Sequence, residues 1–484
     1  MSTSIQTLSP TALWKNFDNL NAVPRASKKE ERVIAFAKNF GESLGLETFV
    51  DEVGNVIIKK PATAGMENRT TVVMQSHLDM VHQKNASTEF DFDTQGIKML
   101  IENDWVRADG TTLGADNGIG VATIMAILES TDIPHPPIEA LFTIDEETGM
   151  TGAMGLKGGL LDGKIMLNLD TEDDNELTIG CAGGIDITAK GNYIPINYST
   201  PQKSWKISIK GLSGGHSGMD IHKGLGNANK LMNRFLMAAA KKLRIRIHSI
   251  EGGGLRNAIP RESFAIIVVA EKHETALQVL VAKYANIYKN EYQITDPDFQ
   301  LTIETSENVS TVLKRVFQGK LLRSIYACPN GIYRMSPDIK DLVQTSNNLA
   351  RVFVKDGKYE ILCLTRSSVD SEKMDEAQAI ASTFELIGAQ VSHGGSYPGW
   401  EPKSGSAIVK LMTEIYEEMF EEHPHVNACH AGLECGILGK NYPDMEMISF
   451  GPNIRGAHSP DEKVQISSVQ KFWTYLLETL KRIP

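Results

Sequence analysis

Cysteine is scarce in this chain. Five cysteines occur among 484 residues, they are scattered, and no two of them form a Cys-x-x-Cys motif. An odd number of dispersed cysteines argues against a disulfide framework and against a structural zinc site built from thiolates. We therefore expect free thiols and a reducing, cytoplasmic environment.

Long apolar runs and dense positive charge are also missing. No stretch of about 18 apolar residues occurs, so we expect no transmembrane helix. The N-terminal sequence MSTSIQTLSP lacks a basic patch followed by an apolar core, so we expect no signal peptide. The chain has 49 Lys and Arg against 60 Asp and Glu, a net charge of −11, without a dense basic run. This balance argues against nucleic acid or a membrane as a partner.

Several catalytic signatures are absent as well. The glycine-rich segment 110–120 has neither the GxGxxG spacing nor a Walker lysine, so it supports nucleotide binding only weakly. No GxSxG motif marks a serine nucleophile. No cysteine has an evident activating context, although the pair Cys429-His430 leaves covalent catalysis open.

The composition that remains is that of a globular protein with a substantial core. Hydrophobic residues make up 41% and charged residues 23% of the chain. At 484 residues, two or three domains are expected.

Three predicted strands share one feature, which is that polar side chains follow directly after them. The apolar run 70–75 precedes His77, the run 138–144 precedes the acids 145–147, and the run 163–169 precedes Asp170. Ligands of open α/β sheets bind at the carboxyl ends of the strands. Each acidic strand end taken alone is more often a solvated loop or a helix cap. Their convergence on one edge of a sheet is much harder to attribute to chance.

His77 and Asp79 project from the same side of an extended chain. Such a carboxylate holds an imidazole in one orientation and one tautomer, as is common for metal-bound histidines. A plain ion pair at a strand end is an equally good interpretation of these two residues alone.

Two glycine-rich loops contribute further candidates. The segment 110–120 presents Asp116 at the start of a predicted helix, where a simple N-cap is the alternative role. The segment 451–462 places His458 in a loop after another predicted strand. Two histidines, two aspartates and the pair Glu146-Glu147 form a nitrogen and oxygen ligand set for two divalent metals. One of the two glutamates could bind metal while the other deprotonates a water molecule.

The pattern of predicted strands and helices changes near position 195 and changes back near 394. Between these points, alternating strands and separate helices indicate an α+β layer rather than regular parallel crossovers. This part contains His216 in a glycine-rich loop, and also Asn257 and Arg366. An ordinary surface histidine is an alternative interpretation of His216.

Long, ordered motifs give the chain a family resemblance. SHLDMV, GTTLGADNGIG, DEETGM, NLDTED and GAHSPDE resemble the metal-site signatures of the aminoacylase-like family of co-catalytic zinc exopeptidases. PATAGMENR, CAGGID, GGHSGMDIHKGLGNANKL, RNAIPRE, SYPGW and HAGLECG extend the likeness over essentially the whole chain. They are similar to the members that cleave Xaa-His dipeptides.

The resemblance implies a fold and a domain organisation. The fold would be an α/β catalytic domain of the zinc-exopeptidase type, with a mixed, mostly parallel sheet between helices. An α+β lid domain would interrupt it. We expect the catalytic domain to comprise 1–190 and 397–484, and the lid and dimerisation domain to comprise 191–396. The resemblance also implies a homodimer.

The resemblance further implies two bound Zn²⁺ ions, with Mn²⁺ or Co²⁺ as possible substitutes. His77 and Asp170 would bind one ion, Glu147 and His458 the other, and Asp116 would bridge them. The peptide bond after the bridging aspartate is often cis in this family, so we expect a cis bond between Asp116 and Asn117.

Roles in catalysis follow from the same resemblance. Glu146 would be the general base, Asp79 would orient His77, and His216 would stabilise the oxyanion. The residues implied to hold the substrate or form its pocket are Asn257, Arg366, Gly432 and Glu434.

The implied activity is metal-dependent hydrolysis of dipeptides, with a preference for the Xaa-His type, such as β-alanyl-histidine, and a broader range beyond it. One rival is an N-acyl amino acid amidohydrolase on the same scaffold. The other is a metal- or peptide-binding protein without turnover.

Overall fold

The computed structural model describes residues 4–198 and 202–484, which divide into two compact units. Unit 1 runs to Gly180 and resumes at Trp400–Ala428 and Leu433–Pro484, whereas unit 2 comprises Cys181–Gly399 and Cys429–Gly432. The predicted boundaries at 190/191 and 396/397 lie inside β9 (Gly183–Asn192) and β21 (Gln390–Tyr397). Both strands are hydrogen-bonded into the sheet of unit 2, so the division lies outside them.

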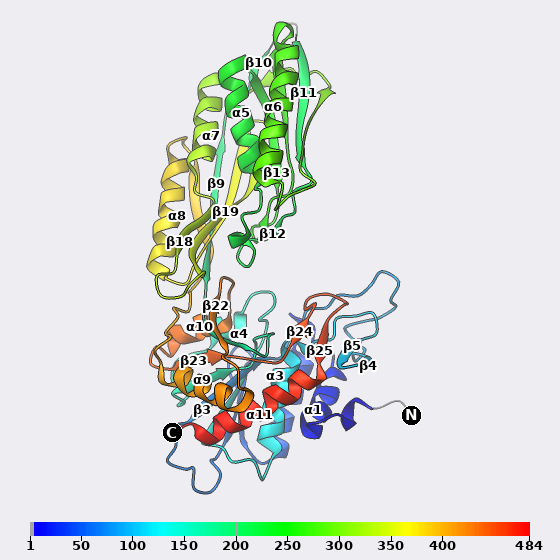
Figure 1. Ribbon diagram of the computed structural model, residues 1–484, viewed down its shortest axis with the longest axis vertical. Helices are drawn as coiled ribbons and strands as arrows, with labels where there is room; N and C mark the ends of the chain where they lie inside the picture. Colours follow the sequence, from blue (N-terminus) through cyan, green and yellow to red (C-terminus); the bar gives the residue numbers. More distant parts are fainter. Residues whose placement is uncertain (1–3, 199–201) are drawn as a thin grey trace. The chain divides into compact units, whose positions relative to one another are not determined.

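Unit 1 is built on an eight-stranded mixed sheet of order β1-β2-β6-β3-β7-β23-β8-β22 (Figure 1). Its four central strands, β6, β3, β7 and β23, are parallel. Pairings of β1 with β2, β2 with β6, and β23 with β8 are antiparallel. The strands are β1 Glu47–Val50, β2 Val56–Lys60, β3 Val72–His77, β6 Ile138–Thr143, β7 Ile165–Asn168, β8 Glu176–Cys181, β22 His425–Cys429 and β23 Glu446–Ser449.

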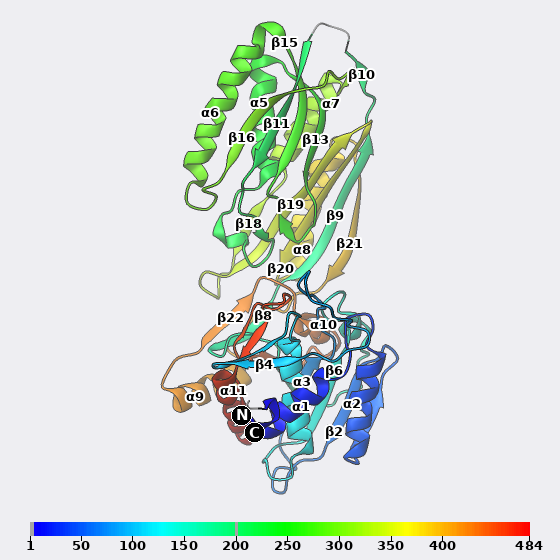
Figure 2. The same cartoon turned by 90° about the vertical axis from the view of Figure 1, so that its right-hand side faces the viewer.

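Helices cover this sheet, and Figure 2 shows α1 and α3 on one side of β2 and β6, with α2 on the other. The helices of unit 1 are α1 Thr11–Asn21, α2 Glu31–Ser43, α3 Ala115–Glu129, α4 Thr151–Gly155, α9 Ala407–Phe420, α10 Glu434–Asn441 and α11 Ile466–Arg482. Trp14 and Phe17 of α1 share an apolar core with Ile119 of α3 and Val469 of α11.

A four-stranded sheet of order β24-β25-β5-β4 also belongs to unit 1. Its strands are β4 Met99–Glu102, β5 Trp105–Ala108, β24 Ile454–Arg455 and β25 Lys463–Gln465. The loop between β24 and β25 carries His458, so this small sheet fixes both ends of that loop.

Unit 2 contains one nine-stranded antiparallel sheet of order β16-β11-β15-β13-β19-β20-β9-β21, with β18 added beside β19. Its strands besides β9 and β21 are β11 Gln202–Lys210, β13 Arg246–Gly253, β15 Ser263–Ala270, β16 Gln300–Ser306, β18 Gly331–Met335, β19 Val343–Lys355 and β20 Lys358–Ser367. Short pairs join β10 Ile196–Asn197 to β17 Thr311–Val312, and β12 Gly215–His216 to β14 Ala258–Ile259.

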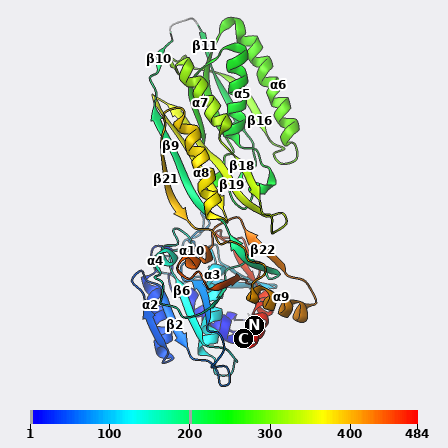
Figure 3. The same cartoon turned by 90° about the vertical axis from the view of Figure 1, so that its left-hand side faces the viewer.

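Four helices cover one face of this sheet (Figure 3). They are α5 Ala228–Leu243, α6 Glu274–Tyr292, α7 Arg315–Ala327 and α8 Asp370–Glu385. Phe235, Leu277, Leu321 and Phe384, one from each helix, join a single buried apolar core. Short 3₁₀ turns lie at Ile5–Thr7, Ile221–Lys223 and Glu271–His273. Within the described residues, no helix is both long enough and apolar enough to cross a membrane.

Candidate metal centre and active site

The parallel strands of unit 1 bring the predicted residues to one edge. His77 is the last residue of β3, which pairs with β6 on one side and β7 on the other. Glu146 and Glu147 follow β6, and Asp170 follows β7. The prediction that these three strand ends meet is therefore confirmed by the topology.

Helix α3 supplies the fourth component. Asp116 is its second residue, and the helix packs against β3. The peptide bond between Asp116 and Asn117 is cis, as expected. The Asn117 side chain donates to the backbone oxygen of Leu169 at 2.6 Å, which connects the start of α3 to the end of β7.

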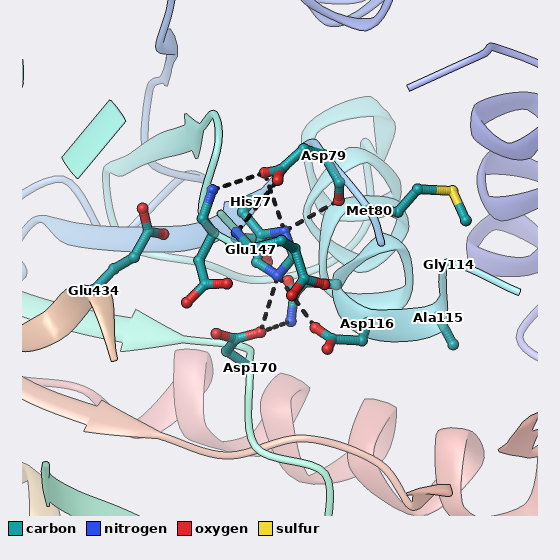
Figure 4. A network of polar contacts seen from close by, with 12 residues as sticks. His77, Asp79, Met80, Gly114, Ala115, Asp116, Glu147, Asp170 and Glu434 are labelled. Carbon is teal, nitrogen blue, oxygen red and sulfur yellow. Dashed lines mark hydrogen bonds and ion pairs between the residues drawn. The ribbon is translucent and has the colours of Figure 1, made fainter. Parts of the chain in front are cut away.

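Asp116 lies between the two histidines, and its two carboxylate oxygens contact different ones. Its Oδ1 is 3.1 Å from Nε2 of His77, and its Oδ2 is 3.2 Å from Nε2 of His458. Asp170 Oδ1 lies 3.5 Å from Nε2 of His77, and Glu147 Oε2 lies 3.0 Å from Nε2 of His458. Figure 4 shows His77, Asp116, Glu147 and Asp170 turned toward a common centre.

This arrangement fits two divalent cations. Among the groups with converging ligand atoms are His77, Asp116 and Asp170, and also Asp116, Glu147 and His458. Asp116 belongs to both groups, which is the geometry of a shared bridging carboxylate. The Oε1 atom of Glu147 is buried and has no hydrogen-bond partner within the described chain. Imidazole and carboxylate donors suit zinc, manganese or cobalt.

The electrostatics of the site also favour bound positive charge. Hydrogen bonds that His458 donates to Asp116 and then to Glu147 raise its pKa to about 11, against the effect of burial. Burial, followed by the charges of Asp116 and Asp170, raises the pKa of Glu172 to about 8. Several acids thus compete for few positive charges, a situation that cations relieve.

Asp79 lies beside His77. Its backbone oxygen lies 3.1 Å and its Oδ1 lies 3.4 Å from Nδ1 of His77. The carboxylate also accepts the backbone N–H groups of Glu146 at 3.0 Å and Glu147 at 3.3 Å. One buried aspartate therefore orients the histidine and holds the turn that carries both glutamates.

Glu146 and Asp145 differ sharply in their environments. Burial raises the pKa of Glu146 well above its usual value, with His77 opposing and Asp170 adding to the shift. Asp145, at φ 55°, accepts from Lys28 Nζ at 2.6 Å and from the Thr151 hydroxyl at 2.7 Å. Asp145 is therefore held within the turn that follows β6.

Glu434 is the first residue of α10. It is fully buried, and its Oε2 accepts from Gln75 Nε2 and Thr143 Oγ1, each at 2.6 Å. Burial is the main cause that raises its pKa to about 8. In Figure 4 it lies to the side of the ligand group.

The remaining predicted residues belong to unit 2. His216 is in β12, whose partner β14 begins beside Asn257. Nδ1 of His216 accepts the backbone N–H of Gly218 at 3.2 Å and that of Met219 at 3.0 Å. Accepting at Nδ1 places the proton of the neutral ring on Nε2. Burial, followed by the charge of Arg366, lowers the pKa of His216, so the ring is neutral near pH 7.

Arg366 is buried on β20 and donates to the Tyr397 hydroxyl at 2.8 Å. Its Nε has no hydrogen-bond partner within the described chain. His430, which sequence reasoning left open, is 2.7 Å from Ser346 Oγ, and burial, aided by Arg366, lowers its pKa to about 3. Gly432 is half-buried in the same unit.

Sequence reasoning missed two charged residues of unit 1. Glu462 accepts four backbone N–H groups of residues 113–116, and Arg25 donates to the backbone oxygens of Leu78, Asp79 and Gly114. Glu462 ends the GAHSPDE motif, which was a usable signal. Arg25 belongs to none of these motifs, and no local sequence pattern indicated a role for it.

Fold and site together define a hydrolase of the kind that works with bound metal ions. The model of peptidase family M20/M25/M40 matches residues 73–482, and the chain belongs to this family. The resemblance inferred from the motifs and the predicted peptidase class are thus confirmed.

Relatives align over the full length of the chain. The cytosol non-specific dipeptidase of Escherichia coli (strain K12) is 44% identical over 481 residues, covering 99% of this chain and 98% of the relative. The crystal structure of aminoacylhistidine dipeptidase from Vibrio alginolyticus has a TM-score of 0.93 at 43% identity, covering 100% of this chain and 98% of that one. The α/β fold with its mixed sheet is confirmed. Aminopeptidase PepT from Bacillus cereus, at 16% identity and a TM-score of 0.57, shares the fold alone.

Proposed function

We propose that this protein is a dipeptidase that hydrolyses the peptide bond of Xaa-His pairs such as β-alanyl-histidine, and other dipeptides as well. One observation carries the proposal: Asp116 is shared between His77 and His458. Glu146, whose backbone lies on the same turn as Glu147, is the adjacent free acid. The two full-length relatives with dipeptidase names support the same substrate class.

The cofactors we propose are two Zn²⁺ ions, which Mn²⁺ or Co²⁺ could replace. His77 and Asp170 would hold one, Glu147 and His458 the other, and Asp116 both. When bound, such ions polarise the scissile carbonyl and increase the acidity of water.

Glu146 is the proposed general base. It is half-buried near His77 and Glu147, and its raised pKa suits a group that takes and returns a proton. It accepts a proton from the attacking water and then delivers it to the leaving amine. Asp79 keeps His77 and the turn of Glu146 in position throughout.

Residues of unit 2 would bind the substrate. The proton on Nε2 makes His216 a hydrogen-bond donor, which is the property needed to stabilise a developing oxyanion. Arg366 has unused donor capacity and suits the C-terminal carboxylate of a dipeptide. We assign Asn257, Gly432 and Glu434 to the substrate pocket on the resemblance.

The unit that contains residues 191–396 is the proposed lid and dimerisation domain, and the protein is proposed to act as a homodimer. We further propose a cytoplasmic location, in line with the name of the Escherichia coli relative. Sedimentation should then give twice the chain mass of 53.2 kDa.

An N-acyl amino acid amidohydrolase would use the same chemistry, so substrates decide between the two activities. A binding protein without turnover has no need for a free acid such as Glu146.

The test is a substrate panel with zinc-loaded protein and measured metal content. We expect rapid hydrolysis of β-alanyl-histidine and other dipeptides, and little hydrolysis of N-acetyl-histidine. Faster cleavage of N-acetyl-histidine would favour the amidohydrolase. If two equivalents of zinc bind and neither class of compound is cleaved, the catalytic proposal is wrong.

A further inference from the structure

The loop that presents Asp116 is held by one carboxylate that is not itself a candidate metal ligand. Glu462 Oε2 accepts the backbone N–H groups of Leu113 at 2.7 Å and Gly114 at 2.9 Å. Its Oε1 accepts those of Ala115 at 2.7 Å and Asp116 at 3.2 Å. Glu462 is only 2% exposed, so these four bonds are shielded from competing water.

Glu462 also belongs to the loop that carries His458. Its backbone N–H donates to Ser459 at 3.1 Å, and the Ser459 N–H donates to Gly456 at 3.2 Å, so the loop folds back on itself around His458. The His458 side chain is 58% exposed, and its ion-pair partners in the described chain are Asp116 and Glu147. Packing therefore restrains the His458 side chain little. The position of His458 depends instead on its loop, which Glu462 anchors.

Arg25 binds the same loop from its carbonyl side. Its Nη2 donates to the backbone oxygen of Gly114 at 2.6 Å, and its Nη1 donates to those of Leu78 at 3.1 Å and Asp79 at 3.2 Å. Arg25 is 1% exposed, and Glu462 is the largest of the charges that stabilise its cationic form against burial. Gly114, at φ 70°, leaves room for the guanidinium, because a Cβ there would collide with it.

We propose that Glu462 and Arg25 are positioning residues of the metal centre, which act through the backbone. Glu462 sets the position of Asp116 relative to His458. Arg25 sets the position of Asp116 relative to His77, because it binds backbone carbonyl groups close to both residues. Gly114 lies two residues before Asp116, and Leu78 directly follows His77. This inference rests on the proposed metal centre. It adds to that proposal the two residues that hold the shared ligand Asp116 in place.

The substitution Glu462→Gln tests the first half. A glutamine amide keeps the size but presents N–H donors to some of the four N–H groups, so the loop must shift. We expect the affinity for at least one of two Zn²⁺ equivalents to fall at least tenfold, measured with Zn²⁺ alone against a chromophoric chelator. The absorption spectrum of the Co²⁺-loaded variant should also change. Asp461→Asn, at the exposed neighbouring residue, is the matched control and should behave as wild type.

Arg25→Lys tests the second half, since an ammonium cannot span three carbonyl oxygens as a guanidinium does. A similar loss of Zn²⁺ affinity is expected, whereas Arg32→Lys on the surface of α2 serves as its control. Glu462→Asp, which keeps the charge, should retain more affinity than Glu462→Gln, and it replaces that variant if Glu462→Gln does not fold.

Thermal unfolding of the metal-free proteins separates a positioning role from a general loss of stability. A positioning variant should unfold near the temperature of the metal-free wild type while its affinity for Zn²⁺ is reduced. Variants with the affinities of wild type for both Zn²⁺ equivalents would overturn the inference while leaving the dipeptidase proposal intact. A wild-type protein that binds no Zn²⁺ would instead overturn the metal centre itself, and the inference with it.

Discussion

At the scale of single residues, Glu146 and Glu147 show how two identical neighbours come to differ. Both follow β6 and both are held by Asp79 through their backbone N–H groups. The Glu147 carboxylate contacts His458 at 3.0 Å, whereas the described chain provides no hydrogen bond or ion pair to the Glu146 carboxyl. A carboxyl without a fixed partner remains available to move a proton.

Single substitutions of Glu146 and Glu147 separate their roles. We expect Glu146→Gln to lower kcat by about 10²–10⁴, the usual contribution of a general base, while two metal equivalents stay bound. Glu147→Gln should instead weaken metal binding, because it removes a ligand of the second group. Turnover and metal content are measured on the same samples. Near-normal turnover in Glu146→Gln would remove this residue from the mechanism.

Glu376 on α8 is a buried acid outside the site. Both of its carboxyl oxygens are buried and have no partner within the described chain, and burial, followed by the charge of Asp375, raises its pKa to about 8. In the unfolded chain the group ionises near its ordinary value of 4.5. The folded state therefore binds the proton more tightly than the unfolded state. The contribution of Glu376 to stability is complete below pH 4.5 and is lost as the pH rises through about 8.

Glu376→Met removes this penalty. We expect the free energy of unfolding to increase by roughly 4 kcal/mol at pH 8, where most of the penalty for ionising the buried group is expressed, and to change little near pH 4.5. Urea unfolding followed by circular dichroism at both pH values is the measurement. Glu385→Gln, at an exposed position of the same helix, should leave the pH dependence unchanged. An equal effect of Glu376→Met at both pH values would contradict the argument.

At the scale of secondary-structure elements, α3 is the helix on which the site depends. Every residue of α3 except Asp116 and Glu129 is buried, so it has no polar face. Close approach to the sheet is possible because Gly120 has no side chain. A Cβ at Gly120 would collide with the Ser76 hydroxyl and lie 2.8 Å from the backbone oxygen of Leu169.

Gly120→Ala should therefore separate α3 from the ends of β3 and β7. Overpacking of this kind costs about 1–3 kcal/mol of stability, and activity should fall with it because Asp116 moves. Gly319→Ala is the matched control, since the helix α7 places only the flexible end of Arg323 near that position. That control should be neutral or more stable by up to about 1 kcal/mol. Equal unfolding midpoints for the two variants would show that the contact is not tight.

At the scale of the whole molecule, the division of the chain explains the long separations within the site. Unit 2 is inserted into unit 1, so His77 and His458 lie at opposite ends of the sequence. Both contact Asp116, and ions bound there would join segments that are distant along the chain. Ligands that bind only the folded state stabilise it.

Removal of metal should consequently lower the unfolding temperature and abolish hydrolysis. At a free metal concentration of 100 times Kd, one bound ion adds about 2.7 kcal/mol of stability. Scanning calorimetry before chelation, after chelation and after reloading with Zn²⁺ measures the effect. Mg²⁺ at the same concentration is the control, because it suits imidazole ligands poorly. A chelated protein with unchanged stability and activity would exclude a metal-dependent mechanism.

Much of the site was predictable because it follows directly from strands. The apolar run 138–144 matches β6, Ile138–Thr143. Amphipathic periodicity and buried strands are local patterns, and polar residues at strand ends extend them by a few positions. The family motifs then linked His77, Asp116 and His458, which no local pattern connects.

The sequence by itself determined the strands, the residue types at their ends and the family. Only the tertiary structure decided that Glu434 is fully buried beneath polar side chains, that Nδ1 of His216 is occupied by backbone donors, and that Glu462 and Arg25 hold the loop of Asp116. The physical reason is that burial and hydrogen bonding depend on which segments meet. Glu462 lies 346 residues from Asp116 along the chain, and sequence spacing carries no record of that contact.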